Sequence, residues 1–214
     1  MSDYLHVEAQ WFSAVSTTAR GARTRARLIE ATKEVVGSHG YSRATTRTIA
    51  EAAGVCEATI YRHFPDKIAL FFAAVVEQHA PVIAWMAELP DRAGTVTVAE
   101  NLAASLRHLA VLGKDLAPLE LAILGDPELA RRRREGGGAP PGPPSYLAAY
   151  LQAEQRLGRV RADLVPGQIA LVLLATLFGV VAAHVGAEGP VDARLIDVAV
   201  DAFARGLQPD PSTT

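Results

Sequence analysis

Residues 45–67 read TTRTIAEAAGVCEATIYRHFPDK, and this stretch decides the fold. It contains two short segments with helical spacing, Thr46–Ala53 and Glu57–Phe64, separated by Gly54. Glycine ends a helix at little cost because it adopts the left-handed backbone conformation easily, and Pro65 closes the second segment. The apolar positions expected to pack the two helices together are Ile49, Ala50, Ala53, Val55 and Ile60. The stretch therefore predicts a helix-turn-helix unit.

The second of these helices is short enough to enter the major groove of DNA, where side chains reach base edges. The residues expected to face outward from it are Glu57, Ala58, Thr59, Tyr61, Arg62 and His63. Phosphates are favoured at the positive start of the first helix, which carries Thr45, Thr46 and Arg47. Lys67 opens the following helix and can reach another phosphate. Arg62 suits either a guanine or a phosphate, and both interpretations stay open.

The charge distribution agrees with a DNA-reading segment attached to a different kind of domain. Residues 20–67 carry nine Lys/Arg and five Asp/Glu, a net charge of +4, whereas the rest of the chain has a net charge of −6. A basic run, Arg20, Arg23, Arg25 and Arg27, precedes and enters the first predicted helix. It either contacts phosphates and the minor groove, with Arg25 among the best placed, or is a solvated helix start.

Helical periodicity continues along the chain, and the fold class is expected to be all-α. The predicted helices cover residues 25–38, 46–53, 57–64, 66–89 with a bend near Pro81, 98–113, 116–124, 127–134, 146–157, 166–185 and 191–207. We expect a flexible arm over 1–22, a three-helix DNA-binding domain over 23–68, and a disordered tail over 208–214. A larger helical domain for ligand binding and dimerisation fills 69–207. Residues 135–145, EGGGAPPGPPS, are expected to form a surface loop.

The segment TTRTIAEAAGV followed by ATIYRHFPDK resembles the DNA-binding signature of the tetracycline-repressor family, and RLIEATKEVVGSHGY upstream is similar to that family's first helix and turn. The resemblance covers about residues 25–70; beyond them it is architectural. It implies a homodimer that binds a palindromic operator in double-stranded DNA and is released by a small-molecule effector. It also implies DNA contacts by Thr45, Thr46, Arg47, Glu57, Ala58, Thr59, Tyr61, Arg62, His63 and Lys67.

Cys56 departs from this pattern, because relatives often carry a helix-capping serine there. A thiol is a poorer hydrogen-bond acceptor, and a lost cap costs about 1 kcal/mol. Its place at a helix start permits either a redox-sensing role or a simple small residue in a turn. Because Cys56 is the single cysteine, an intramolecular disulfide is excluded, and a reducing, cytoplasmic compartment is expected. No leader sequence is expected, because the first residues lack a basic segment followed by an apolar run.

The larger domain is expected to enclose an effector. The residues proposed for ligand contact are Trp85, Met86, His108, Tyr146, Tyr150, Thr176, Phe178 and His184. With few charges expected inside, the ligand is predicted to be apolar or aromatic. No carboxylate–histidine cluster indicates a metal, and no cofactor is expected. Small residues in the last two helices favour a dimer interface, with an intramolecular core as the alternative.

The sequence also bears on other functional classes. An enzyme is disfavoured because the GxSxG, HExxH, Walker and GxGxxG motifs are absent. A helical adaptor that does not read DNA sequence, and an activator in place of a repressor, stay open. Residues 169–185 are apolar, but at 17 residues they reach only the short limit of a membrane span. A buried helix is the preferred interpretation, and no membrane partner is expected.

Overall fold

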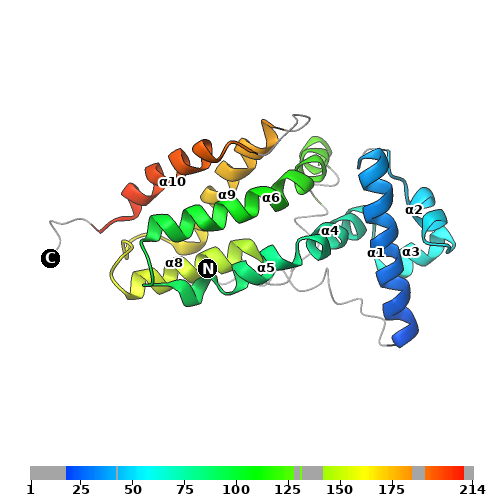
Figure 1. Cartoon of the computed structure of the whole chain (residues 1–214), viewed down its shortest axis with the longest axis horizontal. Coiled ribbons are helices and arrows are strands. Elements are labelled where there is room, and N and C mark those ends of the chain that lie inside the picture. Colours follow the sequence, from blue (N-terminus) through cyan, green and yellow to red (C-terminus); the bar gives the residue numbers. More distant parts are fainter. Residues whose placement is uncertain (1–17, 42, 128–130, 132–141, 185–190, 210–214) are drawn as a thin grey trace. The chain divides into compact units, whose positions relative to one another are not determined.

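The computed structural model describes residues 18–41, 43–127, 131, 142–184 and 191–209, and the regular elements in these ranges are all helical (Figure 1). The predicted all-α class is confirmed. The chain divides into two compact units after Ala80, and Pro118–Pro140 groups with the first unit. The sequence places this division after residue 68. The structure keeps the next helix with the first unit because Leu70, Ala73 and Ala74 are buried in that unit's core.

The first unit is built from α1 (Ala19–His39), α2 (Thr46–Ala52), α3 (Glu57–His63) and α4 (Lys67–Gln78). The expected flexible arm is wrong over residues 19–22, which already belong to α1. Thr18 makes this early start possible, because its hydroxyl accepts a hydrogen bond from the Gly21 amide at 3.2 Å and so caps the helix. Residues 1–17 of the expected arm lie outside the described residues.

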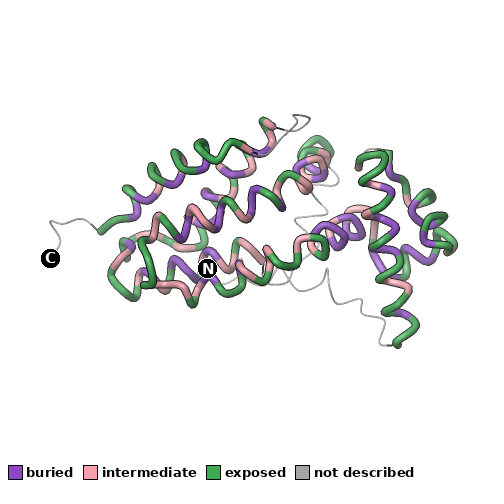
Figure 2. Tube along the Cα trace, viewed as in Figure 1, coloured by how far each residue is buried: buried purple, intermediate pink, exposed green. Residues whose placement is uncertain are grey.

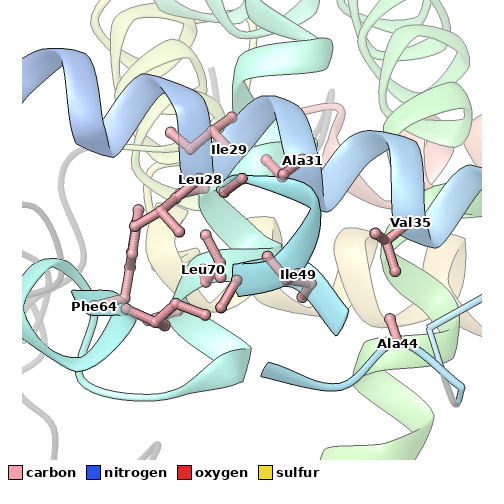
Figure 3. Close-up of a cluster of buried hydrophobic side chains, with 14 residues drawn as sticks. Leu28, Ile29, Ala31, Val35, Ala44, Ile49, Phe64 and Leu70 are labelled. Carbon is pink, nitrogen blue, oxygen red and sulfur yellow. The ribbon is translucent and has the colours of Figure 1, made fainter. Parts of the chain in front are cut away.

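One apolar core joins these four helices. Figure 3 shows Leu28 and Ile29 of α1 gathered with Ile49 of α2 and Leu70 of α4. All four side chains are almost fully buried, as is Ile60 of α3. Burying a leucine or isoleucine stabilises the folded state by roughly 1.5–3 kcal/mol. The predicted packing positions are confirmed as buried at Ile49, Ala50, Ala53 and Ile60, and Val55 packs against the same core while half-buried.

The other helices are α5 (Ala80–Ala87), the 3₁₀ helix η2 (Leu89–Arg92), α6 (Val98–Gly125), α8 (Pro143–Arg156), α9 (Pro166–Ala182) and α10 (Ala193–Leu207). The sequence predicts two helices where α6 is one, continuing past Gly113 and Pro118. Gly113 serves close packing here, because a Cβ at this position would lie 3.4 Å from Val181 of α9.

Helix α8 begins earlier than predicted, so residues 143–145 are helical and the expected loop over 135–145 is wrong at that end. The Ser145 hydroxyl accepts a hydrogen bond from the Gly142 amide at 3.0 Å, which fixes this helix start. Residues 135–141, most of the predicted helix over 127–134, and residues 210–214 of the expected tail lie outside the described residues.

One ion pair lies in the second unit, where the sequence predicts few charges. The side chain of Glu154 on α8 is completely buried. One carboxylate oxygen accepts from the Gly94 amide at 3.2 Å, and the other lies 3.4 Å from Nε of Arg159. Arg159 also donates to the carbonyl of Val96. The ion pair therefore ties the loop after η2 to the end of α8, and local helical periodicity gives no sign of a contact between residues 60 positions apart.

Within the described ranges, no single helix is long and apolar enough to cross a membrane, and only the bent pair α4–α5 passes on length and composition. The same ranges contain no group of three histidine, cysteine, aspartate or glutamate side chains that could hold a metal ion.

Candidate nucleic-acid interface

The start of α2 is fixed by a reciprocal pair of threonines. The Thr45 hydroxyl accepts from the Thr48 amide at 3.1 Å, and the Thr45 amide donates to the Thr48 hydroxyl at 3.0 Å. This capping box satisfies two amides that a helix start otherwise leaves unpaired. Arg47 projects into solvent and donates to Glu51 at 3.0 Å. The sequence locates these residues at the start of α2 correctly, with Thr45 or Thr46 expected as the cap, and in the structure the cap is Thr45.

The turn between α2 and α3 is held by an arginine from α1. Gly54 has a φ of +62°, a conformation that favours glycine. The Arg27 guanidinium donates to the Ala53 carbonyl at 2.5 Å, and a Cβ at Gly54 would lie 3.1 Å from that same nitrogen. Arg27, one member of the predicted phosphate-reaching run, thus makes an intramolecular hydrogen bond while its side chain stays exposed.

Replacing Gly54 by alanine is expected to lower the free energy of unfolding by about 1–2 kcal/mol. The positive φ strains any other residue, and the added methyl group crowds the Arg27 guanidinium. Chemical denaturation followed by circular dichroism measures the loss. Gly37→Ala is the matched control, because Gly37 lies within α1 with nothing within 4 Å of an added Cβ. That variant should gain about 0.5–1 kcal/mol, and equal effects at both positions would contradict the role of the turn.

Helix α3 presents a smaller outward face than its sequence suggests. Glu57, Ala58, Tyr61 and Arg62 are exposed, and Tyr61 retains 55% of its accessible surface. Thr59 and His63 are only 5% and 9% exposed, so the expectation that they face outward is wrong. They share the buried side with Ile60 because residues four apart lie on the same face of a helix. The surface available to base edges is therefore formed by four side chains.

His63 sits at the end of α3 in an unusual environment. Its Nδ1 atom is buried and has no hydrogen-bond partner. Burial lowers the pKa of His63, and the nearby Arg62 and Arg25 guanidinium groups lower it further. Folding therefore favours the neutral ring, since a charged imidazole there would lose its hydration and face two cations.

The pKa of His63 is lower in the folded chain than its ordinary value near 6.5. The stability that the neutral ring contributes is therefore fully present above pH 6.5, and it is lost as the pH falls through the lowered pKa. We expect the His63→Gln variant to lose less stability than the parent chain between pH 7.5 and pH 5. Urea unfolding at the two pH values measures this difference. His39→Gln, on an exposed residue of α1, is the control and should keep the parental acid sensitivity. Identical acid sensitivity in His63→Gln would contradict the expectation.

Two cations near the end of α3 rest on aromatic rings. The Lys67 ammonium donates to the Tyr41 carbonyl at 3.0 Å and lies 4.2 Å from the centroid of the Tyr41 ring. Its burial lowers its pKa. The Arg25 guanidinium lies 4.9 Å from the centroid of the Phe64 ring. Both cations are half-buried and oriented by these contacts. Sequence reasoning missed Tyr41 and Phe64 as their supports.

Cys56 occupies the cap position of α3, as predicted, and its side chain makes no capping hydrogen bond to the helix. The thiol lies 3.1 Å from the Thr59 hydroxyl, and this contact lowers the pKa of Cys56. The side chain is exposed. A redox role stays a prediction.

The residues expected to contact a ligand all belong to the second unit, and the structure brings two of them together. Trp85 of α5 stacks on His108 of α6 with ring centroids 4.3 Å apart. The Arg92 guanidinium lies 4.8 Å from the centroid of the Trp85 ring. Sequence reasoning missed Arg92 as a neighbour of this pair. Burial, together with the Arg92 charge, lowers the pKa of His108.

The remaining candidates are more dispersed. Met86 and Tyr150 are completely buried, and burial, together with the nearby Glu154 carboxylate, raises the pKa of Tyr150. Thr176 donates to the Val172 carbonyl at 3.0 Å, and Nδ1 of His184 lies 2.7 Å from the Val180 carbonyl, so both polar groups are used within α9 and the turn that follows it. Tyr146 and Phe178 are half-buried.

Comparison with known proteins gives a consistent result. Residues 28–74 match the family described as bacterial regulatory proteins, tetR family. The HTH-type transcriptional repressor AcnR of Corynebacterium efficiens is 33% identical over 89 residues, which span 42% of this chain and only 45% of that protein. The AcnR of Corynebacterium diphtheriae is 28% identical over 91% of this chain and 98% of its own length.

Among solved structures, Thermus thermophilus FadR, a TetR family transcriptional repressor in complex with lauroyl-CoA, superposes with a TM-score of 0.69. The two chains are 22% identical, and the superposition covers 89% of this chain and 98% of that one. At this identity the superposition establishes the shared fold alone, including the helical body that follows the helix-turn-helix.

Proposed function

We propose that the chain, whose residues 28–74 match the family of bacterial regulatory proteins, tetR family, is a cytoplasmic, ligand-responsive repressor that binds a palindromic operator. The exposed face of α3 carries this proposal. It presents Glu57, Ala58, Tyr61 and Arg62 on a helix that packs on the buried core and follows the capped helix α2. A short, rigid helix with polar side chains on its outer face suits the major groove. We assign the chain no catalytic role.

Contacts to the DNA backbone are proposed for exposed groups beside that face. Arg47 at the start of α2 and Tyr61 on the exposed face of α3 can approach phosphates, and Arg47 would then exchange its exposed ion pair with Glu51 for a phosphate. Lys67 is held beside Tyr41, and this fixed position lowers the entropy that the side chain would lose on binding. Burial disfavours direct contacts by Thr59 and His63, which we assign instead to the support of α3.

A homodimer is proposed through α9 and α10. Exposed and buried positions alternate along α10 in Figure 2. The exposed side of the two helices carries large apolar residues, including Leu171, Val172, Leu195 and Val198. Exposed apolar surface of this kind favours association. The two helix-turn-helix units of a dimer also double the number of base contacts on a palindrome.

The effector is proposed to bind the second unit near the stacked Trp85 and His108, and to be apolar or aromatic. The similarly folded FadR forms a complex with lauroyl-CoA, a ligand with an apolar acyl chain, and this supports the choice of an apolar ligand class. The protein is then released from the operator if the ligand binds better to one particular conformation of the dimer. In that conformation the spacing of the two helix-turn-helix units no longer fits successive major grooves.

The DNA assignment is tested by fluorescence anisotropy on the promoter fragment that precedes the protein's own coding sequence. Specific binding should fall about 10- to 100-fold when Arg47 and Tyr61 are both changed to alanine, because two backbone contacts are lost. Arg156→Ala removes an exposed arginine of the second unit and should leave affinity unchanged. Unaltered binding by the double variant would contradict the placement of the interface. Weak binding without sequence preference would favour the adaptor alternative.

The ligand assignment is tested with the neutral aromatic probe N-phenyl-1-naphthylamine. The chain has two tryptophans, so Trp11→Phe leaves Trp85 as the single fluorophore of this type. Saturable quenching of Trp85 that also weakens operator binding supports the proposal, and Trp85→Phe should abolish the quenching. Quenching without any change in operator affinity would separate ligand binding from regulation.

A further inference from the structure

The first residues of α2 and α3 are joined by a side-chain contact. The Thr46 hydroxyl donates a hydrogen bond to a carboxylate oxygen of Glu57, 11 positions further along the chain. Glu57 is exposed and Thr46 is half-buried. A hydroxyl carries a single proton, so in this arrangement Thr46 donates to Glu57 instead of to a phosphate. Thr46 was expected to contact the DNA backbone. In the structure its hydroxyl is instead hydrogen-bonded to Glu57.

Glu57 is the single acidic side chain on the exposed face of α3. A carboxylate is repelled by phosphates and accepts hydrogen bonds without donating any. It therefore favours DNA binding only where it meets a donor on a base edge. The major groove offers two such donors, the N4 amino group of cytosine and the N6 amino group of adenine. Adenine places its N7 acceptor beside N6, where it opposes a carboxylate, so cytosine is the better partner.

We infer that Glu57 selects a cytosine at one position of each operator half-site, and that Thr46 is a positioning residue that orients the Glu57 carboxylate. This inference rests on the proposed function. The hydroxyl restricts the carboxylate before DNA arrives, which reduces the rotamer entropy lost on binding. Arg62, the oppositely charged residue of the same face, lies five positions further along the helix and reaches 3.5 Å from the Thr59 hydroxyl.

The experiment is selection of bound sequences from a randomised double-stranded DNA pool with the full-length chain. The parent should enrich a palindrome with a strong cytosine preference at one position per half-site. Glu57→Ala should erase the preference at that position and leave the others intact. Glu57→Gln should move it to adenine, because glutamine pairs with N6 and N7 of adenine. Affinity of both variants for the parental operator should fall about 5- to 150-fold.

Thr46 is tested by variants that separate orientation from structure. Thr46→Val keeps the shape but removes the hydroxyl, and should weaken the cytosine preference without changing the favoured base. Thr46→Ser keeps the hydroxyl and should restore it. Glu51→Gln removes an exposed carboxylate of α2 that pairs with Arg47, and its profile should match that of the parent. Thermal unfolding accompanies each variant, and the isosteric Glu57→Gln serves if the alanine variant fails to fold.

Each outcome bears on a different statement. An unchanged profile in Glu57→Gln, or loss of a preference for a base other than cytosine, overturns the inference and leaves the proposed function intact. A parent that enriches no sequence overturns the proposed function, and the inference with it. An unchanged profile in Thr46→Val overturns the positioning role alone.

Discussion

Replacing Arg159 by methionine is expected to lower the free energy of unfolding by about 3 kcal/mol at neutral pH. Glu154 is completely buried, and Arg159 supplies the cation opposite its carboxylate at 3.4 Å. Removing one partner leaves an uncompensated charge in the interior. The expected loss lies at the low end for buried pairs because 32% of the Arg159 side chain is exposed, so some hydration of the pair already exists.

Guanidinium unfolding followed by circular dichroism measures this change. Arg156→Met is the matched control, because Arg156 is an exposed arginine at the end of α8, the helix that carries Glu154. This variant should alter stability by less than about 0.5 kcal/mol. Combining Arg159→Met with Glu154→Gln should recover most of the loss, since the buried charge is then gone. A single variant as stable as the parent would show that water, not Arg159, compensates the Glu154 carboxylate.

Replacing Ile60 by alanine is expected to remove about 2–5 kcal/mol from the stability of the first unit and, with it, DNA binding at growth temperature. Ile60 is completely buried among Leu28, Ile49 and Leu70 and is the α3 residue that anchors the helix to the core. Truncation leaves a cavity among neighbours that cannot all collapse into it. Thermal unfolding and operator binding, measured on the same samples, follow the two losses together.

The adjacent residue separates stability from recognition. Tyr61 lies on the exposed side, so Tyr61→Ala should change stability by less than about 0.5 kcal/mol while weakening operator binding. Loss of stability in Tyr61→Ala, or normal stability in Ile60→Ala, would mean that the assigned faces of α3 are exchanged.

Local pattern was sufficient for much of the first unit. The spacing of Ile49, Ala50, Ala53 and Ile60 and the position of Gly54 predicted the two short helices, their core positions and their turn. The outward face of α3 was predicted less well. A helix of seven residues has two turns, and its sequence alone does not reveal whether Thr59 and His63 lie toward Ile60 or toward solvent.

The second unit was harder to predict because its determinants are non-local. Nothing near Glu154 in the sequence indicates a partnership with Gly94. The continuation of α6 past the end of this unit and through Pro118 was not predicted either, since proline usually ends or bends a helix. The stacking of Trp85 on His108 joins two helices and pairs two of the eight candidate ligand residues, a contact that the sequence did not predict.

The division of labour along α3 has a consequence for how such a protein diverges after gene duplication. Its four exposed positions contribute nothing to the core cluster, so substitutions there should cost little in folding. A duplicated copy can therefore acquire a new set of target genes by changes at Glu57, Ala58, Tyr61 and Arg62 while inheriting an intact scaffold. The burial pattern of this seven-residue helix therefore allows the DNA target sequence to change while the fold is retained.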